Sequence, residues 1–409
     1  MEDFFQSYFE YASVTKSESP AIFHRWSAIS MVGALLGRQC YLPFGHSYIY
    51  PNQYIMIMGS PGSRKSSAIN IATKLLKLTG YTRFSSDKTS KERFLMDMNP
   101  IPDEDELEDL LDLTLEEPAA TYVAIGEFTD FIGQGNMEFV TMLTNLWDCP
   151  SEYTQPKIHG KSVKVNEPVV NILGGNTAQG FTLAFPPEAL GNGFLSRLIF
   201  VHGETTGRKV TFPKPPDREL EEQLVIRLKE IKSKCRGAFT ITEEAESLFD
   251  RMYNEVVEIE DNRFKHYNTR RLTHLIKLAM IIAVTDLRME IDTEDVLKAN
   301  TLLYYTEKKM PKALGEFGKS RYSDISNTIL DILNTTKSPL TSNDIYKKVS
   351  QDIGKMAELI EVIKNLQHAD KIQLVTVRGR TGYMPNNVAT KEWDKSLVKD
   401  NWLINEEIN

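Results

Sequence analysis

The chain has 409 residues, a net charge of −8 and 41% hydrophobic residues. This length exceeds one typical domain, so we expect two or more units. No stretch approaches the ~20 uncharged apolar residues of a membrane-spanning helix, and the N-terminus lacks the pattern of a signal peptide. We therefore expect an intracellular, cytoplasmic protein. Three dispersed cysteines, Cys40, Cys149 and Cys235, argue against both a zinc site and a disulfide framework.

The negative charge does not exclude a nucleic-acid partner. Much of the acid is clustered, most densely in residues 103–109. A ring-shaped assembly can combine an acidic outside with a basic pore, so the distribution of charge matters more than its sum.

Apolar periodicity predicts the elements in chain order. Residues 1–39 form an N-terminal helical segment with a break near Pro20. Four short apolar runs, at 54–58, 122–125, 169–173 and 198–201, lack alternation and therefore indicate strands buried on both faces. Strands that alternate with helices favour a parallel sheet, and hence an α/β core over residues 40–212.

The second half of the chain is predicted to be helical and then mixed. Residues 213–318 carry a wholly helical pattern, typical of a lid domain beside the sheet. Residues 319–388 predict helices at 322–334, 341–351 and 355–369 and then a hairpin, which together indicate a winged helix. Residues 389–409 are left as a C-terminal tail.

A glycine-rich loop joins the first core strand to a helix. Loop amides and a helix N-terminus suit phosphate, while the lysine reaches the terminal phosphates and the serine hydroxyl binds Mg²⁺. Arg64 stands where such a loop usually has its last glycine. The alternative is a loop that merely contains glycine and lysine. The candidate nucleotide-binding residues are Gly59, Pro61, Gly62, Ser63, Arg64, Lys65, Ser66 and Ser67.

Two further strand ends carry polar candidates. Glu127 follows the second strand, where an ATPase places the carboxylate that orients the attacking water, but Gly126 replaces the Asp that would hold Mg²⁺. We therefore assign metal binding to Ser66 and Glu127. Asn176 ends the third strand, beside the expected γ-phosphate. A surface Glu and a turn-forming Asn are the ordinary alternatives.

Basic residues mark three further features. Alternating residues around His159-Gly160 predict a β-hairpin whose tip suits the phosphodiester backbone, or is simply a solvated turn. Arg197 precedes the fourth strand and either reaches a neighbouring subunit's γ-phosphate or forms a surface salt bridge. Arg270 and Arg271 open a long helix, from which one of them returns to the nucleotide in cis.

Taken in order, these features resemble the minichromosome maintenance helicases, which are hexameric AAA+ motors. The segment from Ala21 to Lys65, with 191–197, also resembles P-loop proteins of phages and mobile elements described as helicases or primase-helicases. The resemblance implies that Asn176 is the first sensor, Arg197 the arginine finger, Arg270 the second sensor and 157–164 a DNA-contacting hairpin. Arg64, Gly126 and the missing N-terminal collar depart from the minichromosome pattern.

We therefore expect a homohexameric, ATP- and Mg²⁺-dependent replicative DNA helicase of a phage or mobile element, working in the bacterial host cytoplasm with other replication proteins. By resemblance, translocation is 3′ to 5′. The alternatives are an initiator or helicase loader, and a degenerate ATPase kept as a DNA-binding scaffold. The candidate DNA-binding residues are Lys157, His159, Lys161 and Lys164 in the hairpin, and Arg378 and Arg380, with Lys347 and Lys348, in the winged helix.

Overall fold

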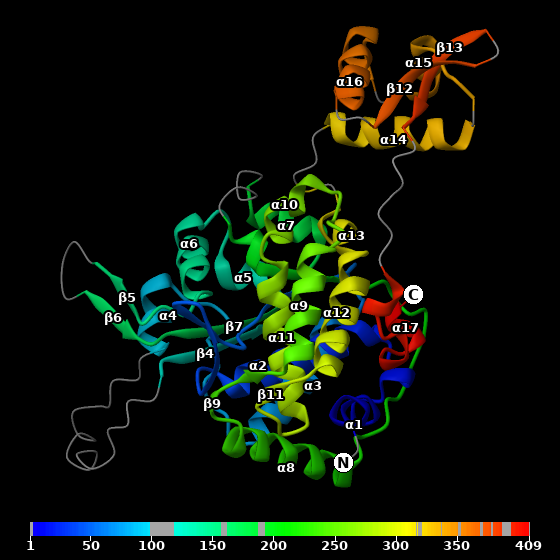
Figure 1. Cartoon of the computed structure of the whole chain (residues 1–409). Helices are drawn as coiled ribbons and strands as arrows, with labels where there is room; N and C mark the ends of the chain where they lie inside the picture. Colours follow the sequence, from blue (N-terminus) through cyan, green and yellow to red (C-terminus); the bar gives the residue numbers. More distant parts are fainter. Residues whose placement is uncertain are drawn as a thin grey trace, which may run out of the picture. The chain divides into compact units, whose positions relative to one another are not determined.

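The computed structural model describes residues 3–98, 118–156, 162–186, 193–315, 317, 321–336, 338–350, 353–368, 371–377, 379–386 and 394–408. The chain divides into two units (Figure 1). Unit 1 comprises Met1–Phe317 and Asp394–Asn409, and unit 2 comprises Gly318–Trp393. Residues of the expected core and lid thus belong to one unit.

A four-stranded parallel sheet lies at the centre of unit 1. Its strands are β3 (Tyr54–Met58), β4 (Ala120–Ile125), β7 (Val169–Asn176) and β8 (Leu198–His202), in the order β4-β7-β3-β8. All three pairings are parallel. The predicted α/β class and the four predicted strands are confirmed. Every residue of β3 and β7 is buried, which explains why their apolar runs do not alternate.

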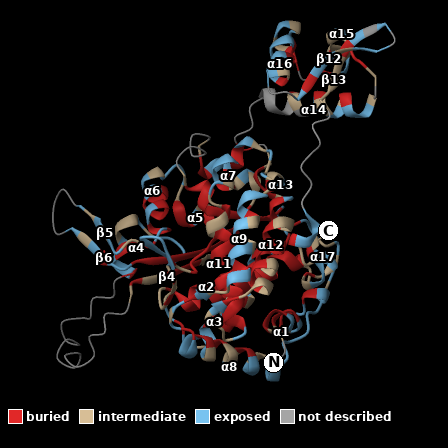
Figure 2. Cartoon of the chain, viewed as in Figure 1, coloured by how far each residue is buried: buried red, intermediate tan, exposed pale blue. Residues whose placement is uncertain are grey.

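Two helices pack against the sheet at the start of the chain's core. α2 (Ala21–Leu36) is buried along its whole length (Figure 2), and it contacts both α3 (Lys65–Leu78) and β7. α1 (Phe4–Tyr11) precedes it, so the expected helices with a break near Pro20 are confirmed. The other helices of unit 1 are α4 (Lys91–Met98), α5 (Phe128–Ile132), α6 (Met137–Leu146), α7 (Ala178–Ala184), α8 (Arg218–Lys234), α9 (Glu243–Asn254), α10 (Lys265–Asn268), α11 (Arg271–Thr285), α12 (Thr293–Glu307), α13 (Met310–Leu314) and α17 (Asn405–Ile408). None of the helices among the described residues is both long and apolar enough to cross a bilayer.

The prediction that residues 213–318 are wholly helical is wrong in detail. Three two-residue strands interrupt the helices: β9 (Gly237–Ala238), β10 (Thr240–Ile241) and β11 (Glu290–Ile291). β9 pairs with β1 (Cys40–Phe44), which pairs in turn with β2 (Ser47–Ile49). Strands this short carry no readable period, and their partners are distant in sequence.

The C-terminal segment packs on unit 1. Arg25 of α2 forms a bidentate ion pair with Glu407, with both distances 2.9 Å and both side chains buried. Asn300 of α12 donates to the carbonyl of Leu397 at 2.7 Å. The chain therefore leaves unit 1 at Phe317 and returns to it at Asp394.

Unit 2 contains the three helices and the hairpin that were expected. They are α14 (Arg321–Thr336), α15 (Ser342–Val349), α16 (Met356–His368), β12 (Ile372–Val377) and β13 (Arg380–Pro385). The two strands are antiparallel. Its own apolar core includes Ile329, Ile345 and Leu359, which makes it a separate packing unit.

Candidate functional site

The loop between β3 and α3 lies at the carboxyl edge of the sheet. Gly59 follows β3, and Lys65 is the first residue of α3. A Cβ atom on Gly59 would lie 2.6 Å from Oγ of Ser63 and 2.8 Å from the Gly203 carbonyl oxygen, so the loop closes on itself only with glycine here. Pro61, Gly62, Ser66 and Ser67 are exposed. Loop and helix N-terminus together form an open cradle.

Arg64 has the backbone conformation that glycine normally supplies. Its φ of 59° lies in the left-handed region, which costs a residue with a Cβ roughly 1–2 kcal/mol. The guanidinium donates to Glu18 at 2.6 Å, and Glu18 also accepts from the Val210 amide at 2.8 Å. These two contacts lower the pKa of Glu18, the Val210 amide contributing most. Arg64 therefore stands in place of the usual glycine, and Glu18 holds its side chain.

Lys65 is buried and bonded to its own loop. Its Nζ donates to the carbonyl oxygens of Gly59 at 2.9 Å and Ser60 at 3.2 Å. Burial lowers the pKa of Lys65, and the nearby Glu127 carboxylate partly opposes this. An anion in the cradle would be a stronger partner for this ammonium than neutral carbonyls are.

Two buried polar atoms beside the loop have no hydrogen-bond partner within the described part of the chain. One is Nδ2 of Asn176, and the other is Oγ of Ser63. Asn176 lies opposite Met58 in the β3–β7 register, and its Oδ1 accepts from the Thr177 amide at 2.9 Å. The amide nitrogen is thus left as a donor beside the cradle. Buried donors of this kind are rarely left unpaired in the functional state of a protein, so these residues fit a ligand with acceptor oxygens.

The close approach of three segments accounts for Gly126. A Cβ there would lie 2.5 Å from Oγ of Ser66, and a Cβ on Gly175 would lie 2.3 Å from the Gly126 carbonyl oxygen. The start of α3, the end of β4 and β7 meet at this point, so an Asp at 126 would require them to separate. Glu127 is the N-cap residue of α5 and is exposed. Ser66 and Glu127 remain the candidate metal ligands, and no cluster of three or more His, Cys, Asp or Glu occurs in the described ranges.

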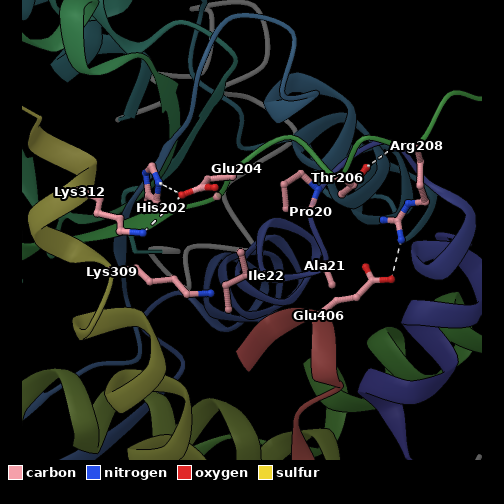
Figure 3. A pocket seen from close by; sticks show the side chains of 11 residues that line it. Pro20, Ala21, Ile22, His202, Glu204, Thr206, Arg208, Lys309, Lys312 and Glu406 are labelled. Carbon is pink, nitrogen blue, oxygen red and sulfur yellow. Dashed lines mark hydrogen bonds and ion pairs between the residues drawn. The ribbon is translucent and has the colours of Figure 1, made fainter. Parts of the chain in front are cut away.

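A cavity of about 290 Å³ lies at the same edge of the sheet. His202 ends β8, next to Met58 of β3 in register, and the cavity is also lined by the start of α2 and by α13 (Figure 3). Glu204 lies between His202 and Lys312, and Arg208 pairs with Glu406 at 2.6 Å. Gly203 lines this cavity, and its carbonyl oxygen lies against Gly59, so the cavity adjoins the loop.

Arg197 lies at the amino-terminal ends of the strands, whereas the loop lies at their carboxyl ends. It directly precedes Leu198, which pairs with Tyr54 at the start of β3, so the length of β3, roughly 13 Å, separates it from the loop. Its guanidinium donates to Asp148 at 2.7 Å and to the Gly193 carbonyl at 3.0 Å. An arginine side chain is shorter than this distance, so Arg197 does not reach the loop of its own chain.

Arg270 belongs to the same cluster as Arg197. Its Nε donates to Oγ of Ser196 at 3.1 Å, while Arg271 is committed to Glu307 at 2.8 Å. These contacts are with Ser196 and Glu307 rather than with the loop, so the structure lends no support to the expectation that one of these arginines returns to the nucleotide in cis. Arg270 and Arg197 remain candidates for contact with a phosphate on another chain.

Neither protein-family models nor curated protein sequences match this chain. We therefore infer its function from the residues themselves.

The sequence did not identify the residues that surround Arg197. Trp147 is buried, and three cations lie against its ring: Lys277 at 4.1 Å, Arg197 at 5.5 Å and Arg270 at 5.6 Å from the centroid. Burial lowers the pKa of Lys277 to about 8. Trp147 and Asp148, which follow α6, belong to no recognisable sequence motif. Their position beside Arg197 is therefore evident only from the fold.

The predicted hairpin is present in part. β5 (Glu152–Gln155) and β6 (Val163–Asn166) pair antiparallel, and Lys164 forms an ion pair with Glu152 at 2.6 Å. Lys157, His159 and Lys161 lie outside the described residues. In unit 2, Arg378 and the side chain of Arg380 also lie outside them, whereas Lys347 and Lys348 are exposed on α15.

Proposed function

We propose that this chain is an AAA+-type ATPase that hydrolyses ATP at interfaces between identical subunits and uses it to move single-stranded DNA. The proposal rests on one observation: the charged groups are divided between the carboxyl ends and the amino ends of the strands of one sheet. Lys65 and Asn176, whose Nδ2 has no hydrogen-bond partner among the described residues, lie at the carboxyl ends of the strands, and Arg197 and Arg270 lie at the other ends. A head-to-tail assembly of copies would bring the two halves together.

ATP, when bound, supplies the γ-phosphoryl group that water attacks. Lys65 would exchange the carbonyls of Gly59 and Ser60 for phosphate oxygens, and its ammonium would neutralise their charge. Glu127 would accept the proton of the attacking water, and the Asn176 amide would orient that water. Ser66 and Glu127 would hold Mg²⁺, largely through water, because Gly126 supplies no carboxylate.

The neighbouring copy would complete this site. Arg197 and Arg270 would meet the charge that develops on the phosphoryl oxygens, a contribution of ~10³-fold or more in comparable sites. Six subunits in a ring, a pore lined by the β5–β6 hairpin and a role in replicating phage or mobile-element DNA follow from the resemblance to minichromosome maintenance-type helicases. Unit 2 would act as a winged helix that contacts fork DNA through Lys347 and Lys348.

A second candidate, a nucleotide-dependent assembly switch without turnover, is favoured by Gly126. The tight approach of Gly126 to Ser66 leaves the metal with one hydroxyl and one exposed carboxylate. Such a protein would bind ATP and assemble on DNA as an initiator or loader does, or as a degenerate scaffold.

The deciding experiment measures ATP hydrolysis with and without single-stranded DNA, together with strand displacement on a forked duplex. DNA-stimulated hydrolysis with strand displacement is the expected result. ATP binding without hydrolysis would replace the motor with the switch, and the absence of nucleotide binding would overturn both.

A further inference from the structure

One face of the small sheet β2-β1-β9 presents three tyrosines. Leu42 and Ile49 face the interior and are buried, whereas the alternate residues Tyr41 and Tyr48 lie on the outer face, with Tyr50 in the same alternation. The ring centroids of Tyr41 and Tyr48 are 4.9 Å apart, and those of Tyr41 and Tyr50 are 6.3 Å apart. Tyr48 is 56% exposed. We call these three residues the tyrosine face.

Exposed cations adjoin the tyrosine face. Arg236 directly precedes β9, whose Gly237 pairs with Cys40 of β1. Lys232 and Lys234 end α8, and the Lys232 carbonyl accepts from Gln39, the residue before β1. All three cationic side chains are exposed. Glu230 pairs with Lys234 at 2.8 Å, whereas Lys232 and Arg236 form no ion pair within the part of the chain that the structure describes.

Arg38 joins the tyrosine face to the base of the β5–β6 hairpin. Its guanidinium lies 4.5 Å from the centroid of the Tyr50 ring. The same group donates to the carbonyl oxygens of Pro150, before β5, at 2.9 Å and Pro168, after β6, at 3.3 Å. A strand of DNA that passes the hairpin base would thus meet the tyrosine face next.

We propose that the tyrosine face binds single-stranded DNA by stacking bases on Tyr41 and Tyr48, with the phosphates beside Arg236 and Lys232. An exposed ring, Tyr48, beside a partly exposed one, Tyr41, on a sheet next to cations is a combination that suits single strands, because unpaired bases offer their flat surfaces whereas those of a duplex are covered. The inference rests on the proposed function only in taking DNA as the ligand. A second copy of the chain is the alternative occupant, and the neighbouring cations favour DNA over an uncharged contact.

The test compares the double variant Tyr41→Ala, Tyr48→Ala with wild type by fluorescence anisotropy of a fluorescein-labelled oligo(dT) 20-mer and of a duplex of equal length. Binding is measured without nucleotide and with a nonhydrolysable ATP analogue. We expect the dissociation constant for the single strand to rise at least about fivefold for each ring removed. Tyr41→Phe, Tyr48→Phe should retain binding, since phenyl rings also stack. Thermal melting checks that each variant is folded.

Tyr253→Ala is the matched control, because Tyr253 is 58% exposed and lies on the helix α9 rather than on a strand of this sheet. It should bind as wild type does. Lys232→Ala with Arg236→Ala should lower the salt dependence of binding, by about 0.7 in logarithmic slope for each phosphate that the protein then fails to bind. The tyrosine variants should leave that slope unchanged.

Three results would overturn the inference. The first is a folded Tyr41→Ala, Tyr48→Ala variant with wild-type affinity, and the second is a wild-type protein that binds no single strand. The third is a change of the double variant's oligomeric state in sedimentation velocity at unchanged affinity per chain, which would make the face a contact between copies. ATP hydrolysis, measured separately, tests the proposed function, so the two can fail independently.

Discussion

The guanidinium of Arg197 donates to the carboxylate of Asp148 at 2.7 Å, within one chain. Asp148 is half exposed while the arginine is buried, and Nε of Arg197 has no hydrogen-bond partner among the described residues. Because that Nε atom is itself buried, a phosphate that arrives from another chain would have to displace the Asp148 carboxylate to bind the Nη of Arg197.

Arg197→Ala should bind ATP nearly as wild type does and hydrolyse it ~10³-fold more slowly, because its phosphate contact is made in trans. Mixed with inactive Lys65→Ala, it should recover part of the activity, since some interfaces then pair an intact Lys65 with an intact Arg197. The measurement is the ATPase rate across mixing ratios, with subunit exchange followed by energy transfer. Activity equal to the average of the two parents, despite exchange, would assign Arg197 a structural role.

Lys65→Ala alone should reduce hydrolysis at least about a hundredfold, because a preorganised charge facing the phosphate is removed. Lys74→Ala is the matched control, since Lys74 is exposed on the same helix and pairs with Glu221 at 3.4 Å. Both variants should melt near the wild-type temperature. A folded Lys65→Ala protein with normal turnover would show that the loop is not the site of hydrolysis.

Glu127→Gln should bind ATP and Mg²⁺ but hydrolyse roughly 10²–10⁴-fold more slowly, because a general base contributes a factor of that size. The stalled protein should accumulate as an oligomer in size-exclusion chromatography with ATP. Asp130→Asn, an exposed carboxylate on the same helix, is the control and should behave as wild type. The reverse result would move the base to Asp130.

Lys277 should make the free energy of unfolding depend on pH in the alkaline range. Burial lowers its pKa in the folded protein to about 8 from 10.5, so between these values the unfolded chain binds the extra proton. Stability therefore rises as the pH increases through this window, by up to ~3 kcal/mol, and is lost again as the pH falls towards 8. Urea unfolding of wild type and Lys277→Met between pH 7.5 and 10.5 measures the difference. Parallel pH profiles would mean that Lys277 titrates normally.

Adjacent glutamates in α17 should differ in their effect on stability. Glu407→Ala leaves Arg25 buried and unpaired, which should cost about 3–5 kcal/mol. Glu406→Ala removes a partly exposed pair with Arg208 and should cost about 1 kcal/mol or less. Chemical denaturation of both variants provides the comparison. Equal losses would mean that the C-terminal segment is not anchored through Arg25.

The parallel sheet and the loop were predictable because their information is local. An unalternating apolar run such as 54–58 identifies a doubly buried strand, and the glycine-rich loop with the helix from Lys65 follows directly. The three helices and the hairpin of unit 2 were predictable for the same reason, since each is longer than one period of its pattern.

Only the tertiary structure decided the contacts between distant residues. Asp148 lies 49 residues before Arg197, and Glu407 lies 382 residues after Arg25, and neither residue carries a signal for its partner. The reason for Gly126 likewise appears only when β4, β7 and α3 meet within van der Waals distance. Local sequence determines which segments become strands and helices, whereas burial and close packing, which depend on the whole chain, determine which side chains they bring together.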